Sequence, residues 1–132
     1  MELSVFYDTE NDIIVTKPVA EITMENIRFV SLKVLELSDA HNCNYIFIDL
    51  TECILGQTLL EGFLGMQNMR ESTGLNYNHI CAVLYKPEFY PDDRAQFIEN
   101  VVANRINPTL KMFKKYNEAL KWLKEKQEHL KE

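Results

Sequence analysis

Two stretches of this chain are apolar at nearly every position and are only as long as a β-strand. They span residues 45–50 and 79–85. Strands with one face in water alternate apolar and polar residues, whereas strands covered on both faces lose that alternation. The two stretches therefore predict central strands of a parallel sheet with helices on both faces, and the fold class is α/β.

The segments around these strands predict an alternation of strands and helices. An N-terminal hairpin is expected from strands at 3–6 and 13–16, because the polar residues 8–12 between them favour a turn. Helical periodicity follows near 23–40, 59–71 and 92–106, then a short strand at 110–113 and a last helix. We expect the order β-β-α-β-α-β-α-β-α, a mixed and mostly parallel sheet with about four helices, in a single domain of residues 1–132.

Helix ends and buried faces are also predicted from individual residues. Asp92 or Asp93 is expected to cap the third helix, and Asn117 the last one, since short polar side chains favour the N-cap position. The third helix is expected to bury the apolar face that contains Phe97.

Composition excludes several classes of protein. A net charge of −6 argues against nucleic-acid binding, which needs a basic face. The three cysteines, Cys43, Cys53 and Cys81, show no CxxC spacing, so reduced thiols are expected. The longest apolar runs are too short to span a membrane, and the acidic N-terminal residues do not resemble a signal peptide. We therefore expect a cytoplasmic protein.

No motif for a cofactor or a metal is present. The sequence has no GxSxG, glycine-rich phosphate loop or HExxH. His41, Cys43, His79 and Cys81 are expected at one edge of the sheet, because each lies near the start of a predicted strand. Their spacing fits no zinc motif, and we expect neither a metal nor a cofactor.

Three segments in this order resemble the SpoIIAA-like branch of the STAS fold, named for sulfate transporters and anti-sigma-factor antagonists. They are IFIDLTECILGQTLLEGF at 46–63, ICAVLYKPEFYPDDRAQFI at 80–98 and LKMFKKYNEALKWLKEK at 110–126. The resemblance implies a non-enzymatic regulatory or protein-interaction module with a protein partner. Some relatives with this fold bind nucleotides or apolar molecules, so a small-ligand binding protein is the alternative.

The resemblance also implies a position for phosphorylation. Signalling STAS domains carry a phosphorylated serine at the start of the second helix, usually after an aspartate, and Gln57-Thr58 occupies the matching positions here. A phosphate on Thr58 would gain from the helix dipole. The competing interpretation is a capping box, in which Thr58 and Glu61 satisfy the first amides of the helix.

The polar residues after the two central strands define a candidate binding surface. The loops that follow neighbouring parallel strands meet at one edge of a sheet, where α/β proteins place ligands. The candidate residues are Asp49, Thr51, Gln57, Thr58, Tyr85, Phe89, Tyr90 and Arg94. Two structural interpretations compete: Asp49 caps its own loop, and Phe89 and Tyr90 form a hydrophobic staple for the following helix.

Other hypotheses use the same region. A small ligand would lie between the second and third crossover helices, lined by Leu60, Phe63, Leu64 and Phe89. An acid/base enzyme would need Asp49 to meet Asp92 or Asp93. Separately, the edge strand of the hairpin offers a site for pairing with a second copy as a homodimer.

Overall fold

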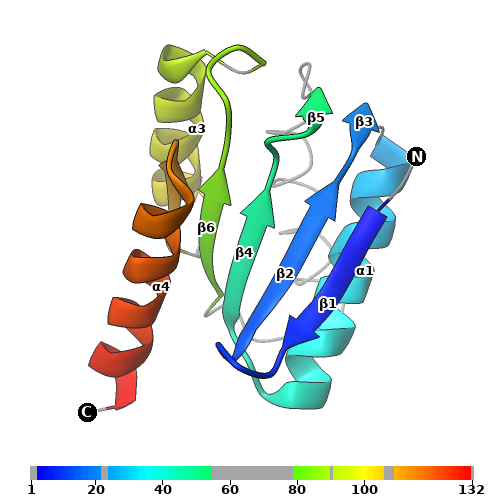
Figure 1. The fold of residues 1–132 in the computed structure, drawn as a ribbon, viewed down its shortest axis with the longest axis vertical. Coiled ribbons are helices and arrows are strands. Elements are labelled where there is room, and N and C mark those ends of the chain that lie inside the picture. The colour runs from blue at the N-terminus through cyan, green and yellow to red at the C-terminus, as the bar shows by residue number, and fades with distance from the viewer. Residues whose placement is uncertain (1–2, 22–23, 55–78, 90, 106–108, 132) are drawn as a thin grey trace.

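The computed structural model describes residues 3–21, 24–54, 79–89, 91–105 and 109–131. A five-stranded sheet with the order β1-β2-β4-β6-β7 forms the centre of the molecule (Figure 1). Its strands are β1 (Leu3–Asp8), β2 (Ile13–Pro18), β4 (Tyr45–Asp49), β6 (Ile80–Leu84) and β7 (Thr109–Phe113). The hairpin partners β1 and β2 are antiparallel, and all other pairs are parallel. The predicted α/β class with a mixed, mostly parallel sheet is confirmed.

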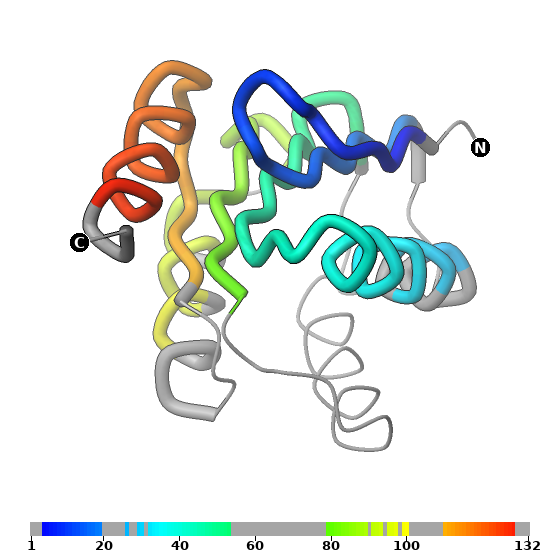
Figure 2. The backbone as a smooth tube through the Cα atoms, turned by 90° about the horizontal axis from the view of Figure 1, so that it is seen from below, coloured from blue at the N-terminus to red at the C-terminus, as the bar shows by residue number. Residues whose placement is uncertain are grey.

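Helices cover both faces of this sheet. In Figure 2, α4 (Tyr116–Lys131) lies on one face, and α1 (Met24–His41) and α3 (Asp92–Arg105) lie on the other. The helix predicted near 59–71 falls outside the described residues.

The central strands are buried on both faces, as their continuous apolar sequence predicts. In β4, Phe47 packs in one cluster with Ala119 and Leu123 of α4. Its neighbour Ile46 points the other way and packs in a second cluster with Val34 of α1. All five of these side chains belong to residues that are at most 2 % exposed. Two cores, one on each face, therefore hold the sheet between its helices.

A second, two-stranded sheet was not predicted. It pairs β3 (Ala20–Glu21) with β5 (Cys53–Ile54), which continue the paths of β2 and β4. Thr16 pairs with Ile48 in the large sheet, and Ala20 pairs with Cys53 in the small one. The chain therefore advances five residues from Ile48 to Cys53, but only four from Thr16 to Ala20. One extra residue is accommodated as a bulge between β4 and β5, in which Leu50 stays buried and Glu52 is exposed.

Both predicted helix caps are wrong by one or two positions. The Ala95 amide donates to the carbonyl of Pro91 at 3.1 Å, so Pro91 precedes α3 and Asp92 is already helical. In α4 the Ala119 amide donates to the carbonyl of Lys115 at 3.2 Å, which places Asn117 inside the helix. A carboxylate in the first turn of a helix is still stabilised by the helix dipole. The acidic residues therefore indicated the start of α3 correctly, although neither of them is the cap.

The predicted burial of Phe97 is also wrong, since this side chain is 58 % exposed. The side of α3 that faces β7 is defined by buried Ala95 and by Glu99, whose carboxylate accepts a hydrogen bond from the Met112 amide of β7. Phe97 lies two residues from each, and two residues turn a helix by roughly 200°. Glu99 of α3, which faces the edge strand β7, therefore takes the inward position that periodicity assigns to the apolar face.

Candidate functional site

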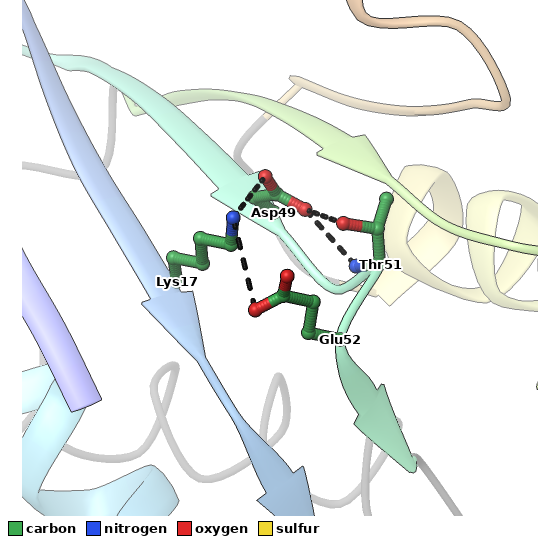
Figure 3. Close-up of polar contacts among 4 residues, drawn as sticks. All are labelled: Lys17, Asp49, Thr51 and Glu52. Atoms are coloured by element: carbon green, nitrogen blue, oxygen red, sulfur yellow. Dashed lines mark hydrogen bonds and ion pairs between the residues drawn. The ribbon is translucent and has the colours of Figure 1, made fainter. Parts of the chain in front are cut away.

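The turn after β4 is held by the side chain of Asp49. Its Oδ1 accepts hydrogen bonds from the Thr51 amide at 3.0 Å and the Thr51 hydroxyl at 2.7 Å (Figure 3). The Cys53 amide closes the turn on the carbonyl of Leu50 at 3.2 Å. Aspartate favours such turns because its carboxylate accepts amides two residues ahead. The loop-capping interpretation of Asp49 is thus what the geometry shows.

A lysine from the neighbouring strand completes this cluster. The Nζ of Lys17 lies 3.8 Å from Oδ2 of Asp49 and 3.9 Å from Oε2 of Glu52 (Figure 3). The Asp49 side chain is only 15 % exposed, whereas that of Glu52 is 55 % exposed. Asp49 therefore has a partner on each oxygen, and Glu52 presents its carboxylate to solvent.

Sequence reasoning missed Lys17 and Glu52. Their meeting depends on the register of β2 against β4, where Thr16 lies beside Ile48, and on the bulge that follows. The signal that pointed to the region was the acidic end of an apolar strand. A parallel register has no signature in the sequence of either strand, so the lysine was not identifiable.

The end of β6 carries a second polar cluster. Tyr85 is buried, and its hydroxyl donates to Oδ1 of Asp92 at 2.8 Å, while Lys114 Nζ lies 3.4 Å from Oδ2 of Asp92. The hydrogen bond from Tyr85 lowers the pKa of Asp92, with Lys114 adding to the effect. Burial, followed by the bond to Asp92, raises the pKa of Tyr85. The tyrosine therefore acts as a neutral donor that fixes the first turn of α3.

An open pocket of about 250 Å³ lies beside this cluster, between α3 and β7. Its lining consists of Tyr85, Asp92, Ala95, Gln96, Glu99, Met112 and Lys114. Most of these groups are polar, in contrast to the apolar ligand site expected between the second and third crossover helices. Of the side chains expected there, Leu60, Phe63 and Leu64 lie outside the described residues.

Phe89 lies on the exposed loop after Tyr85 and is 47 % exposed. Its amide donates to the carbonyl of Lys86 at 3.0 Å, so the loop forms a turn. This loop and the turn after Asp49 emerge from neighbouring strands at the same edge of the sheet, at the top of Figure 1. The Leu50 amide joins them by donating to the carbonyl of Leu84 at 2.8 Å. Among the predicted binding residues, the structure brings Asp49 and Thr51 to the same edge as Phe89.

Asp49 and Asp92 are not brought together. Asp49 pairs with Leu84 in the register of β4 and β6, and the alternation of side chains along β4 puts it on the same face as Phe47, which packs with α4. Tyr85 is the next residue after Leu84, and successive side chains of a strand point to opposite faces. The partner of Asp92 therefore lies on the other side of the sheet. Gln57, Thr58 and Tyr90 lie outside the described residues, as does the side chain of Arg94.

The histidines and cysteines considered as metal ligands lie at the opposite end of the sheet, where the parallel strands begin. Cys43 Sγ donates to the Asp12 carbonyl at 3.2 Å, and Nε2 of His79 lies 3.0 Å from Oγ of Ser38. The ring of His41 stacks on Tyr7 with centroids 3.9 Å apart. Burial raises the pKa of the Cys43 thiol to about 11. Within the part of the chain that the structure describes, no three such side chains form a metal-binding group.

Comparison with known proteins establishes the class of fold. No family sequence model matches this chain, and no curated protein sequence matches it. Solved structures with a SpoIIAA-like fold, the STAS type expected from the sequence, do match, and they cover nearly the whole chain.

Two of these structures are informative. An uncharacterised DUF3478-family protein from Shewanella loihica, described as having a SpoIIAA-like fold, is 16 % identical with a TM-score of 0.57, over 92 % of both chains. An anti-sigma factor antagonist from Mycobacterium paratuberculosis is 14 % identical with a TM-score of 0.58, over 92 % of this chain and 94 % of that one. At this identity the likeness confirms the fold alone. None of the described helices is both long and apolar enough to cross a membrane.

Proposed function

We propose that this protein is a non-enzymatic, cytoplasmic regulatory module that binds a protein partner through the edge where β4 and β6 end. The described part of this strand-end surface consists of Thr51, Glu52, Lys86, Glu88 and Phe89. The predicted residues Gln57, Thr58, Tyr90 and Arg94 extend it in the proposal.

The proposal rests on the exposed aromatic ring of Phe89. This ring lies among exposed charged side chains, on turns that hydrogen bonds hold in place. Phe89 is 47 % exposed, and the neighbouring Lys86 and Glu88 are exposed as well. Asp49 and the Leu50–Leu84 hydrogen bond hold the two turns in place. Interfaces draw most of their affinity from a few such aromatic anchors, and fixed loops lose little entropy on binding.

The fold supports the same class of function. One of the structural neighbours is named as an anti-sigma factor antagonist, which is a role exercised on another protein. The chemistry of the site agrees, since Asp49 is occupied on both oxygens by Thr51 and Lys17. A carboxylate engaged in this way is a poor general base, because a base must reach the substrate's proton.

The test is affinity capture from extracts of the source cells, with bound proteins quantified by mass spectrometry. We expect a partner that is enriched by the wild type and lost with Phe89→Ala and with Glu52→Lys. Glu10→Lys is the matched control, since Glu10 is an exposed glutamate on the hairpin turn at the opposite edge. A partner that survives both strand-end substitutions, or is lost equally with Glu10→Lys, contradicts the proposal.

A second candidate function is favoured by the pocket between α3 and β7. Its volume of about 250 Å³ and its polar lining suit a small polar molecule rather than an apolar one. Native and denaturing mass spectrometry of the purified protein test this candidate, which predicts a retained extra mass in the native spectrum only.

An added mass of one phosphate under denaturing conditions, lost in Thr58→Ala, would instead support Thr58 as a phosphorylation site.

A further inference from the structure

The two edge strands of the five-stranded sheet, β7 and β1, differ in how their outer backbone groups are protected. At one edge, the Glu99 carboxylate of α3 accepts a hydrogen bond from the Met112 amide of β7, so this edge strand is protected. At the other edge, β1 pairs with β2 along its inner side, and its outer side faces no strand of the described structure (Figure 1). Protein edge strands are usually protected by charges, prolines or bulges. Between Ser4 and Tyr7, β1 has none of these, and its register with β2 is unbroken.

An exposed aromatic side chain marks the middle of this edge. Phe6 is 50 % exposed and lies beside Val15 on the face of the sheet where α4 packs. Helix α4 packs mainly against β4, β6 and β7 (Figure 2), and it reaches the hairpin near its turn, where Gln127 donates to the carbonyls of Asn11 and Asp12. The ring of Phe6 is thus an apolar surface directly next to backbone groups that are available for pairing.

We propose that β1 pairs antiparallel with β1 of a second copy of this chain, around a two-fold axis at Phe6. Every second residue of an edge strand directs its N–H and C=O groups toward the outer side. Two residues that lie opposite each other in an antiparallel pair must both direct these groups toward the partner strand, or both direct them away from it. When a strand pairs with its own copy, the axis must therefore pass through a residue that lies opposite itself. The axis at Phe6 pairs residues 4–8 and continues the sheet across both copies.

The side chains favour this register over its neighbours. With the axis at Phe6, the two Phe6 rings lie opposite each other, and Ser4 lies opposite Asp8, so no like charges meet. With the axis at Val5, Phe6 lies opposite Ser4 and the aromatic pair is lost. With the axis at Tyr7, only three residues of each β1 are paired. Aromatic cross-strand pairs stabilise a sheet and like charges oppose it, so the Phe6 register is preferred.

The proposal is independent of the strand-end surface. Because the two copies run antiparallel, their strand-end surfaces lie at opposite ends of the continuous sheet and both stay open to partners. Such a dimer is isologous, since the same residues contribute from each copy.

Sedimentation of the full chain tests the dimer. We expect the wild type to sediment at twice the 15.5 kDa mass of the chain across the micromolar range. Phe6→Lys and Phe6→Glu place like charges opposite each other and are expected to sediment as monomers, whereas their equimolar mixture restores the dimer. A monomeric wild type, or a dimer that persists in both variants, overturns the proposal.

Cysteine substitution tests the register without depending on those variants. The three native cysteines are buried, so Phe6→Cys supplies an accessible thiol at the axis. Directly opposite residues have Cα atoms about 4.5–5.5 Å apart, within the reach of a disulfide. Ser4→Cys is the control, because the two copies of residue 4 would lie roughly 14 Å apart. We expect a covalent dimer on mild oxidation with Phe6→Cys alone, and equal cross-linking at both positions overturns the register.

Discussion

Replacing Asp49 tests whether its carboxylate serves to stabilise the fold or to take part in a reaction. Asp49→Ala removes the acceptor of two hydrogen bonds from Thr51 and one ion pair with Lys17. Each hydrogen bond contributes about 0.5–1.5 kcal/mol, and the ion pair, whose lysine is 40 % exposed, contributes at most about 1 kcal/mol. We therefore expect Asp49→Ala to lower the free energy of unfolding by about 2–3 kcal/mol.

Asp49→Asn is the matched control, because the amide oxygen still accepts from Thr51 while the charge is lost. We expect it to cost about 1 kcal/mol or less. Urea denaturation followed by circular dichroism measures both values, and with an m-value of roughly 1–3 kcal/mol per molar the alanine variant should unfold at about 1 M less urea. Equal losses for the two variants would refute the account, because the charge and not the turn would then be what Asp49 supplies.

Three further predictions follow from buried and exposed groups. Thr16 is 2 % exposed, and its hydroxyl has no hydrogen-bond partner among the described residues, so Thr16→Val should stabilise the protein by about 1 kcal/mol in the same urea assay; a loss of stability would show that the hydroxyl is paired. Phe97→Ala should cost less than about 0.5 kcal/mol, against about 2–5 kcal/mol for Leu123→Ala at 0 % exposure, and comparable losses would place Phe97 in a core. Hydrogen bonds from Asn11 and from Tyr85 lower the pKa values of Asp8 and Asp92 below the ordinary 3.8, so their contribution is present above pH 3.8 and is lost as the pH falls through the lower folded values. Acid titration of Asp92→Asn should show a smaller loss over that range, and an unchanged profile would contradict the assignment.

The fold was predictable because its strongest signals are local. Continuous apolar residues at 45–50 and 79–85 require a sheet covered on both faces, and β4 and β6 lie there. The polar residues between β1 and β2 predicted the hairpin for the same reason, since Asp8 accepts hydrogen bonds from the amides of Glu10 and Asn11 within the turn.

The remaining features depend on contacts between distant segments. Glu99 reads as a solvent-facing residue, yet it satisfies an amide of β7 and thereby turns Phe97 outward. Lys17 and Asp49 meet only because β2 lies parallel to β4 in one register. The bulge that leaves Thr51 half-buried and Glu52 exposed results from pairing of β3 with β5, which are too short to show a pattern of their own.

The central claim, binding of a protein partner at the strand-end surface, is tested most directly by site-specific photo-crosslinking in the source cells. A photoreactive amino acid is placed at Phe89, at Glu52 and, as the control, at Glu10 on the opposite edge. The account predicts the same protein cross-linked from positions 89 and 52 and absent at position 10. Cross-linking of that protein from position 10 alone, or of no protein from positions 89 and 52, would contradict it.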